Sequence, residues 1–161
     1  MKIRKRRTPK ILIAPNKALN TVCVPVVNFQ SYQIKPVIRD MLYCLNKRKY
    51  GVGLAANQIG SNLRIIIVQH TMESFKEYPA VIKYIVMINP VITQNGGSSS
   101  IGYEDCLSYP GRTKRIKRYN WIKLTWANEY GEECNSSFTK ISARIIQHEC
   151  DHLNGQCKVG L

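Results

Sequence analysis

The sequence has no long apolar run and few acidic residues. Its longest purely aliphatic stretch, Ile65 to Val68, has the length of a strand, whereas a membrane-spanning helix needs about 18 consecutive apolar residues. Only 10 Asp and Glu residues stand against 24 Lys and Arg residues, which gives a formal net charge of +14. We therefore expect a chain that does not cross a membrane and whose basic surface favours acidic partners.

Internal repeats and low-complexity linkers are also missing from the 161 residues. A typical domain has roughly 150 residues, and the composition, 44% hydrophobic and 21% charged, is that of a globular protein. We expect one domain over residues 1–161. Residues 1–7 lack the apolar core of a secretory signal, so we expect a solvated basic tail, with an organelle transit peptide as the alternative.

The cysteines follow no compact disulfide framework. They are spread over most of the chain, and a domain of this length can build its core without disulfides. We expect reduced thiols and a cytoplasmic location. The six residues are Cys23, Cys44, Cys106, Cys134, Cys150 and Cys157.

Hydrophobic periodicity predicts an amphipathic helix in the first third of the chain. Within residues 31–49, apolar side chains recur at helical spacing from Ile34 to Leu45. Ser31 is the expected N-cap, and Gly51 is expected to end the helix.

The rest of the chain predicts strands followed by a second helix. Residues rich in β-branched or alternating apolar side chains predict strands at 63–69, 84–92 and 122–126. The Gly- and Ser-rich residues 95–100 predict a loop, and residues 128–131 predict a hairpin turn. A helix is expected over residues 140–153, closed by Asn154 and Gly155. Strands between two helices indicate an α+β fold.

Residues 148–152 read His-Glu-Cys-Asp-His on this last predicted helix. At roughly 100° per residue, His148 and His152 point within about 40° of each other. Glu149 lies at the flank of the pair, close enough to reach a metal-bound water. We expect both imidazoles to share a buried stripe with Ile141 and Ile145. The opposite arc is expected to carry Arg144, Gln147, Asp151 and Asn154.

Two interpretations of the paired histidines remain open from these residues alone. Histidines on an apolar helix face are either core groups with satisfied hydrogen bonds or ligands of a catalytic metal. A catalytic zinc-type site uses about three protein ligands and a water, so a third ligand must come from elsewhere. The remaining histidine, His70, lies at the end of a predicted strand and is a poor candidate.

Three ordered segments resemble the signature motifs of the peptide deformylase family. Residues 51–58 read Gly-Val-Gly-Leu-Ala-Ala-Asn-Gln, residues 104–108 read Glu-Asp-Cys-Leu-Ser, and residues 147–152 read Gln-His-Glu-Cys-Asp-His. The resemblance covers essentially the whole chain. It implies a fold in which antiparallel sheets pack around a C-terminal metal-binding helix.

The resemblance also implies a reaction, hydrolysis of the N-formyl group of N-formylmethionyl peptides with release of formate. Glu149 would act as general base and acid, and Gln58 with the backbone N–H of Leu107 would stabilise the oxyanion. One divalent metal would be required, Fe(II) in the cell, with Zn, Ni or Co as substitutes. The implied metal ligands are Cys106, His148 and His152.

For the substrate, the resemblance implies pairing of the peptide, in β-strand fashion, with main-chain groups of Val52 and Gly53. The pocket for the methionine side chain should be apolar. The expected wall consists of Val52, Leu107, Ile141 and Ile145, each of which has an ordinary core position as its alternative.

Two features depart from the family pattern. Asp105 replaces the glycine that precedes the ligand cysteine, and we expect distortion of the backbone without loss of activity, since Asp tolerates unusual φ angles. The chain also ends nine residues after His152, as in minimal deformylases encoded by some viruses. For such a protein the location would be the host cytoplasm.

Other charged residues have structural interpretations. We expect Glu104 to brace the loop of Cys106, and Asp151 to form a salt bridge with Arg118 or Arg144. A basic segment interleaved with Tyr119 and Trp121 is either generic surface charge or a weak contact with ribosomal RNA. Its basic residues are Lys114, Arg115, Lys117 and Arg118.

Two other functions remain as alternatives. A zincin-type metalloprotease would explain the helix motif but leaves Gln58 and Cys106 without a role. A basic RNA- or protein-binding module with a structural metal would need a fourth ligand, and the sequence offers no obvious one. For the deformylase we expect a monomer.

Overall fold

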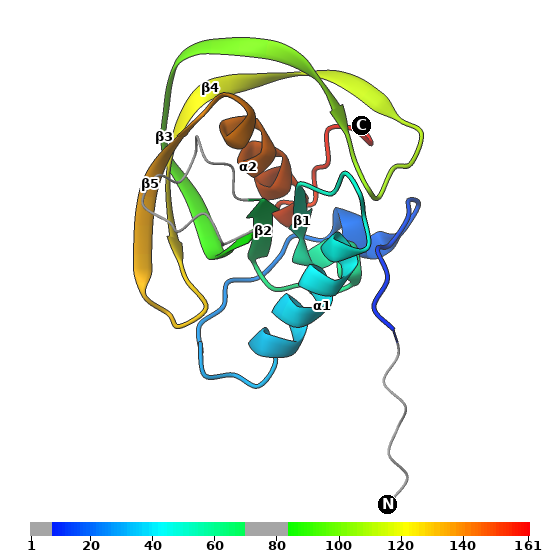
Figure 1. Cartoon of the computed structure of the whole chain (residues 1–161), viewed down its shortest axis with the longest axis vertical. Helices are drawn as coiled ribbons and strands as arrows, with labels where there is room; N and C mark the ends of the chain where they lie inside the picture. The colour runs from blue at the N-terminus through cyan, green and yellow to red at the C-terminus, as the bar shows by residue number, and fades with distance from the viewer. Residues whose placement is uncertain (1–7, 70–83) are drawn as a thin grey trace, which may run out of the picture.

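The computed structural model describes residues 8–69 and 84–161, which form one antiparallel sheet with two α-helices (Figure 1). The predicted tail over residues 1–7 and His70 lie outside the described residues. The α+β class is confirmed, with the strands joined in chain order into a single sheet. The elements are η1 (Lys17–Asn20), α1 (Ile34–Asn46), β1 (Gly53–Ala55), η2 (Ala56–Ile59), β2 (Ile65–Gln69), β3 (Tyr84–Asp105), β4 (Thr113–Ala127), β5 (Glu133–Thr139) and α2 (Lys140–Leu153).

β3 and β4 form a long hairpin that arches around α2 (Figure 1). Their pairing runs from Ile88 opposite Ala127 to Asp105 opposite Thr113, with register shifts at three places. Such bulges bend a strand and increase its twist, which lets the hairpin follow the helix.

The prediction of a loop at residues 95–100 is wrong, because this segment belongs to β3. Gly96 pairs with Trp121 and Ser100 pairs with Arg118, so β4 holds the segment extended despite its composition. Gly97 adopts a φ of +69° between them, at a register shift where a side chain would be strained. Local composition indicated a turn, and strand pairing outweighed it.

β2 explains the longest aliphatic run, because both of its faces are buried. Ile66 and Val68 belong to a core that includes residues of α2. Ile65 and Ile67 lie on the other face, in a core that includes the apolar stripe of α1. A strand covered on both sides reads as a continuous apolar run rather than an alternation.

α1 confirms the predicted amphipathic helix, but it is shorter than predicted. Its N-cap is Gln33, not Ser31. The Ser31 hydroxyl instead accepts the Gln33 N–H at 3.3 Å in the preceding turn. At the other end the helix stops at Asn46, so Gly51 lies in the connection to β1 rather than at the helix end.

The C-terminal part follows the prediction closely. The hairpin turn at residues 128–131 joins β4 to β5, and α2 follows β5 directly. α2 ends at Leu153, and Gly155 has the positive φ (+68°) expected after a helix. All six cysteines lie in the described ranges and are free, as expected. None of the helices described is both long and apolar enough to cross a bilayer.

Candidate metal centre and the adjoining pocket

α2 carries its two histidines into the interior of the protein. His148 and His152 are both buried, with ring centroids 5.1 Å apart. Ile141, predicted to be buried with them, is 55% exposed, so that part of the prediction is wrong. Gln147, predicted to face outward, is buried, because its amide bonds to the N–H and C=O of Tyr119 on β4 (3.1 and 2.9 Å). The sheet curves around α2 and covers more than one face of the helix. A prediction based on a single apolar stripe therefore misassigns which residues are buried.

Cys106 supplies a sulfur atom beside the histidines from a different element. It follows the end of β3 and begins a turn in which its carbonyl accepts the N–H of Tyr109 (3.0 Å). Its Sγ lies 3.2 Å from Nε2 of His152 and 3.7 Å from Nε2 of Gln58. The structure thus brings together the three residues predicted as ligands.

A second sulfur, that of Cys157, completes a buried cluster of four side chains. The possible ligand atoms of Cys106, His148, His152 and Cys157 all lie within 4.8 Å of one another. Cys157 was not among the residues predicted from the sequence. The available signal was its position five residues after His152, in the turn that follows α2.

The two clustered thiols influence each other. Their shared hydrogen bond raises the pKa of Cys106 and lowers that of Cys157, while burial raises both. A hydrogen bond with His152 lowers the pKa of Cys157 further. The lowered pKa favours the thiolate form of Cys157, and thiolates are the sulfur form that binds metals.

Glu104 organises the ring of His148. Its Oε2 accepts the Nδ1–H of His148 at 2.9 Å, which leaves Nε2 of that ring for the cluster. It also accepts two bonds from Arg118, both 2.9 Å, and one from Arg144 at 2.8 Å. Burial alone would raise the pKa of Glu104, but the hydrogen bonds and charges of Arg118 and His148 outweigh it and lower the pKa to about 2. Carboxylate–histidine pairs of this kind orient metal ligands.

The salt bridge expected for Asp151 can now be assigned. Asp151 pairs with Arg118 at 2.5 Å and not with Arg144, which instead joins Glu104. Arg118 is only 3% exposed, so it is no part of an RNA-facing patch. Lys114, Arg115 and Lys117 are exposed on β4.

Asp105 does not distort the backbone, contrary to expectation. It continues β3 in register with Thr113 of β4, and its φ is not positive. Its exposed carboxylate accepts a hydrogen bond from the Thr113 hydroxyl. An extended conformation accepts any residue, so no glycine is needed here.

Glu149 lies fully buried beside the cluster. Its carboxylate packs directly against Gly53 of β1, where an added methyl group would overlap Oε1 and lie 3.0 Å from Cδ. Within the described residues, Oε2 of Glu149 has no hydrogen-bond partner. Burial raises the pKa of Glu149, and the charges of His148 and His152 oppose that rise. A buried carboxylate with a spare oxygen is suited to accept a proton.

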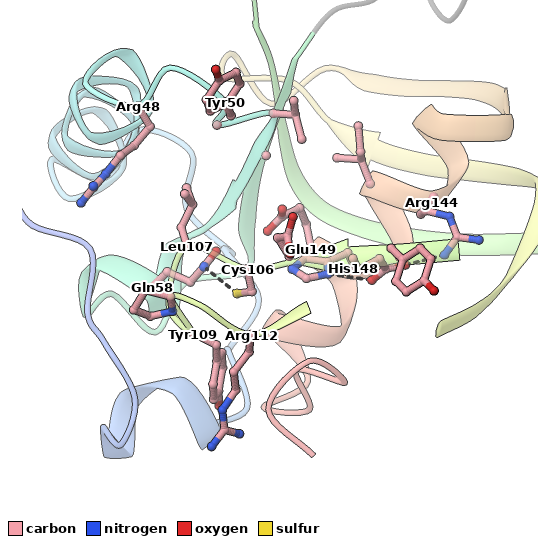
Figure 2. A pocket seen from close by; sticks show the side chains of 18 of the residues that line it. Arg48, Tyr50, Gln58, Cys106, Leu107, Tyr109, Arg112, Arg144, His148 and Glu149 are labelled. Atoms are coloured by element: carbon pink, nitrogen blue, oxygen red, sulfur yellow. Dashed lines mark hydrogen bonds and ion pairs between the residues drawn. The ribbon is translucent and has the colours of Figure 1, made fainter. Parts of the chain in front are cut away.

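Gln58 is held in η2 with its amide aimed at Cys106 (Figure 2). Its Oε1 accepts the N–H of Ala55 (2.9 Å), and its Nε2 donates to the hydroxyl of Ser108 (3.1 Å). These bonds fix the orientation of the amide. Leu107, the residue after Cys106, lies on the same side of the Cys106 sulfur as Gln58 in this view.

A pocket of about 430 Å³ opens over these groups. Figure 2 shows Gln58, Cys106, His148 and Glu149 across its centre, with Arg48 and Tyr50 toward one side. All the residues predicted to bind substrate line it, namely Val52, Gly53, Leu107, Ile141 and Ile145.

The donor set fits a divalent metal. Buried thiol and imidazole groups with mutually close ligand atoms suit Zn, Fe, Co or Ni. Nδ1 of His148 is engaged by Glu104 and Nε2 of His152 faces Cys106, so each ring has a nitrogen available within the cluster.

Comparisons with known proteins agree with this geometry. A family model described as polypeptide deformylase matches residues 8–159. Peptide deformylase 2 of Ralstonia nicotianae is 35% identical over 146 residues, which are 90% of this chain and 81% of that protein. A Met-Ala-Ser-bound class I type b peptide deformylase from Acinetobacter baumannii has a TM-score of 0.80 at 30% identity, covering 93% of this chain and 95% of that one. A probable peptide deformylase from Synechococcus phage S-SSM7 has a TM-score of 0.82 at 29% identity, covering 94% and 98%.

Proposed function

The chain belongs to the polypeptide deformylase family, and we propose that its buried cluster beside Glu149 is the centre that performs the family's reaction. That reaction removes the N-formyl group from the N-terminal formylmethionine of nascent peptides and releases formate. The observation that carries the proposal is the meeting of Cys106, His148 and His152 next to Glu149, whose Oε2 has no hydrogen-bond partner among the described residues, at the pocket. Residues 1–161 would act as one catalytic domain.

The ligands of one divalent metal would be Cys106, His148 and His152, with Fe(II) as the cellular metal and Zn, Ni or Co as substitutes. When bound, such a metal acidifies a water molecule and polarises a carbonyl group. The soft sulfur and the two imidazoles support all four metals. Glu104 would keep His148 in the tautomer that presents Nε2.

Glu149 is the proposed general base and acid. Its free Oε2 would take a proton from the attacking water and later deliver it to the departing amine of the peptide. Burial, which raises the pKa of this carboxyl, moves it toward the range in which it can both accept and return a proton.

Gln58 and Leu107 are the proposed donors to the oxyanion. Nε2 of Gln58 makes one good hydrogen bond, to Ser108, and only a long contact to Cys106, so its second N–H is available to a substrate oxygen. The backbone N–H of Leu107 would add the other donor.

The peptide would lie along β1. β1 is the edge of the described sheet, paired only with β2, so main-chain groups of Val52 and Gly53 can pair with an extended substrate. The methionine side chain would enter the apolar side of the pocket, between Leu107, Ile141 and Ile145. The Met-Ala-Ser ligand of the A. baumannii neighbour supports a methionyl peptide as the occupant.

The proposal also covers the location and the partners of the enzyme. We expect a cytoplasmic monomer, in a host cytoplasm if the chain is virus-encoded. The exposed Lys114, Arg115 and Lys117 support a weak contact with ribosomal RNA.

Products of a formylated test peptide distinguish this reaction from proteolysis. The substrates are formyl-Met-Ala-Ser and a longer peptide that offers internal peptide bonds. Mass spectrometry should show loss of the formyl group and no cleavage of internal bonds. An acetylated peptide of the same sequence is the control for the blocking group. Internal cleavage without formate would identify a zincin-type protease and overturn the proposal.

Gly53→Ala should reduce formate release by about 10²-fold, because a methyl group at this position displaces the carboxylate of Glu149 and misplacement by about 1 Å costs that much. Metal content, measured by elemental analysis, should stay unchanged. Gly96→Ala is a suitable control, since its methyl group would make only ordinary contacts of 3.7 Å or more with Trp121. Full activity of Gly53→Ala would argue against the placement of Glu149.

A further inference from the structure

The turn after α2 places a second thiol in the metal centre. Cys157 is 4% exposed, and its sulfur lies within 4.8 Å of the ligand atoms of Cys106, His148 and His152. Four donor atoms this close to one another have the spacing of a four-coordinate site. Two imidazoles with two thiolates form a common tetrahedral donor set for zinc.

Several contacts hold Cys157 in this position. The N–H of Gln156 bonds to the carbonyl of Asp151 (2.9 Å), and the N–H of Gly160 bonds to the carbonyl of Cys157 (2.9 Å). Nζ of Lys158 lies 3.5 Å from Oδ2 of Asp151, which also binds Arg118. The turn is therefore tied to the charged network that orients His148 through Glu104.

Tight packing encloses the same turn. Cys157 shares an apolar cluster with Cys106, Ile116 and Val159. The ring of Tyr109 lies so close to Gly160 that a Cβ there would overlap it. Such packing restricts the orientation of the Cys157 side chain.

Cys157 and Glu149 border different cavities, and Tyr109 lines both of them. The cavity beside Cys157 has a volume of about 450 Å³. Glu149 and Gln58 border the first pocket, where the peptide would bind. With Cys157 bound as a fourth protein ligand, a substrate oxygen entering from the pocket would be a fifth ligand, a coordination number that catalytic zinc sites reach in the transition state.

We propose that Cys157 is a fourth protein ligand of the metal in the resting protein, giving a set of two sulfurs and two imidazole nitrogens. This inference rests on the metal site of the proposed function and adds a donor to it. A second thiolate makes the site softer, so it favours Zn(II), Co(II) and Fe(II) over metals that prefer oxygen donors. Cys150 is also buried on α2, but it is outside the cluster and belongs to the core under the sheet.

X-ray absorption on reduced, Zn(II)-loaded protein counts the sulfur ligands directly. We expect two sulfurs per zinc in the unaltered chain, one in Cys157→Ser, and two in the matched control Cys150→Ser. With Co(II), the sulfur-to-metal charge-transfer band of Cys157→Ser should have about half the intensity of the unaltered protein. One sulfur per zinc in the unaltered chain would overturn the inference. This result requires no variant, so the test remains valid even if Cys157→Ser misfolds.

The outcome is independent of catalysis because no substrate is present. Two sulfurs together with an absence of formate release would keep Cys157 as a ligand and reject the proposed reaction. One sulfur together with normal formate release would do the reverse.

Discussion

Glu149→Gln should lower kcat/KM for formate release by about 10³-fold, within the range typical for loss of a general acid–base group. Glutamine has nearly the same shape, so it fills the space against Gly53, but it accepts no proton at neutral pH. The metal content should not change, because the cluster atoms come from Cys106, His148, His152 and Cys157. Steady-state formate release and elemental analysis of the same samples check both parts.

The control for this substitution is Glu129→Gln, which removes an exposed carboxylate in the turn between β4 and β5. It should retain the activity of the unaltered chain. Activity of Glu149→Gln within a fewfold of that chain would remove Glu149 from the proposed chemistry. Loss of metal in this variant would instead make it a structural residue of the site.

Glu104→Gln should lower the free energy of unfolding by about 3 kcal/mol or more, since removing one partner of a buried ion pair leaves the other charge uncompensated. Glu104 accepts bonds from Arg118, Arg144 and His148 at 2.8 to 2.9 Å, and both members of the Arg118 pair are nearly inaccessible to solvent. A glutamine amide would turn N–H groups toward some of these donors. Urea denaturation of the metal-free protein measures this effect without the contribution of metal binding.

The same substitution should weaken metal binding by roughly 10- to 100-fold, the usual cost of losing a carboxylate behind a histidine ligand. Glu133→Gln, on an exposed position of β5, should change the unfolding free energy by no more than about 0.5 kcal/mol. If both glutamine variants were equally stable, the network around Glu104 would not have the structural role assigned to it.

The sequence predicted the parts of the site that lie in short local patterns. His148, Glu149 and His152 are fixed relative to one another by helical geometry alone, and α2 has the predicted bounds. The roles of Cys106 and Gln58 could be assigned only through resemblance to a family. No local sequence pattern indicates that the end of β3 lies next to η2 and α2.

The features that were missed depend on distant contacts. Cys157 reaches the cluster through a turn held by Asp151 and covered by Tyr109, and neither contact is visible in the spacing of cysteines. The exposure of Ile141 and the burial of Gln147 follow from the path of β4 around α2. Similarly, Asp105 could be judged only once its pairing with Thr113 was known.

The central claim is that one divalent metal at this cluster supports removal of the formyl group. The direct test strips the protein with a chelator and titrates it anaerobically with Fe(II) or Ni(II), while formate release from formyl-Met-Ala-Ser is recorded. Activity should be absent at first, rise linearly, and level off at one metal per chain. A folded protein that binds one metal per chain and releases no formate at any loading would contradict the account.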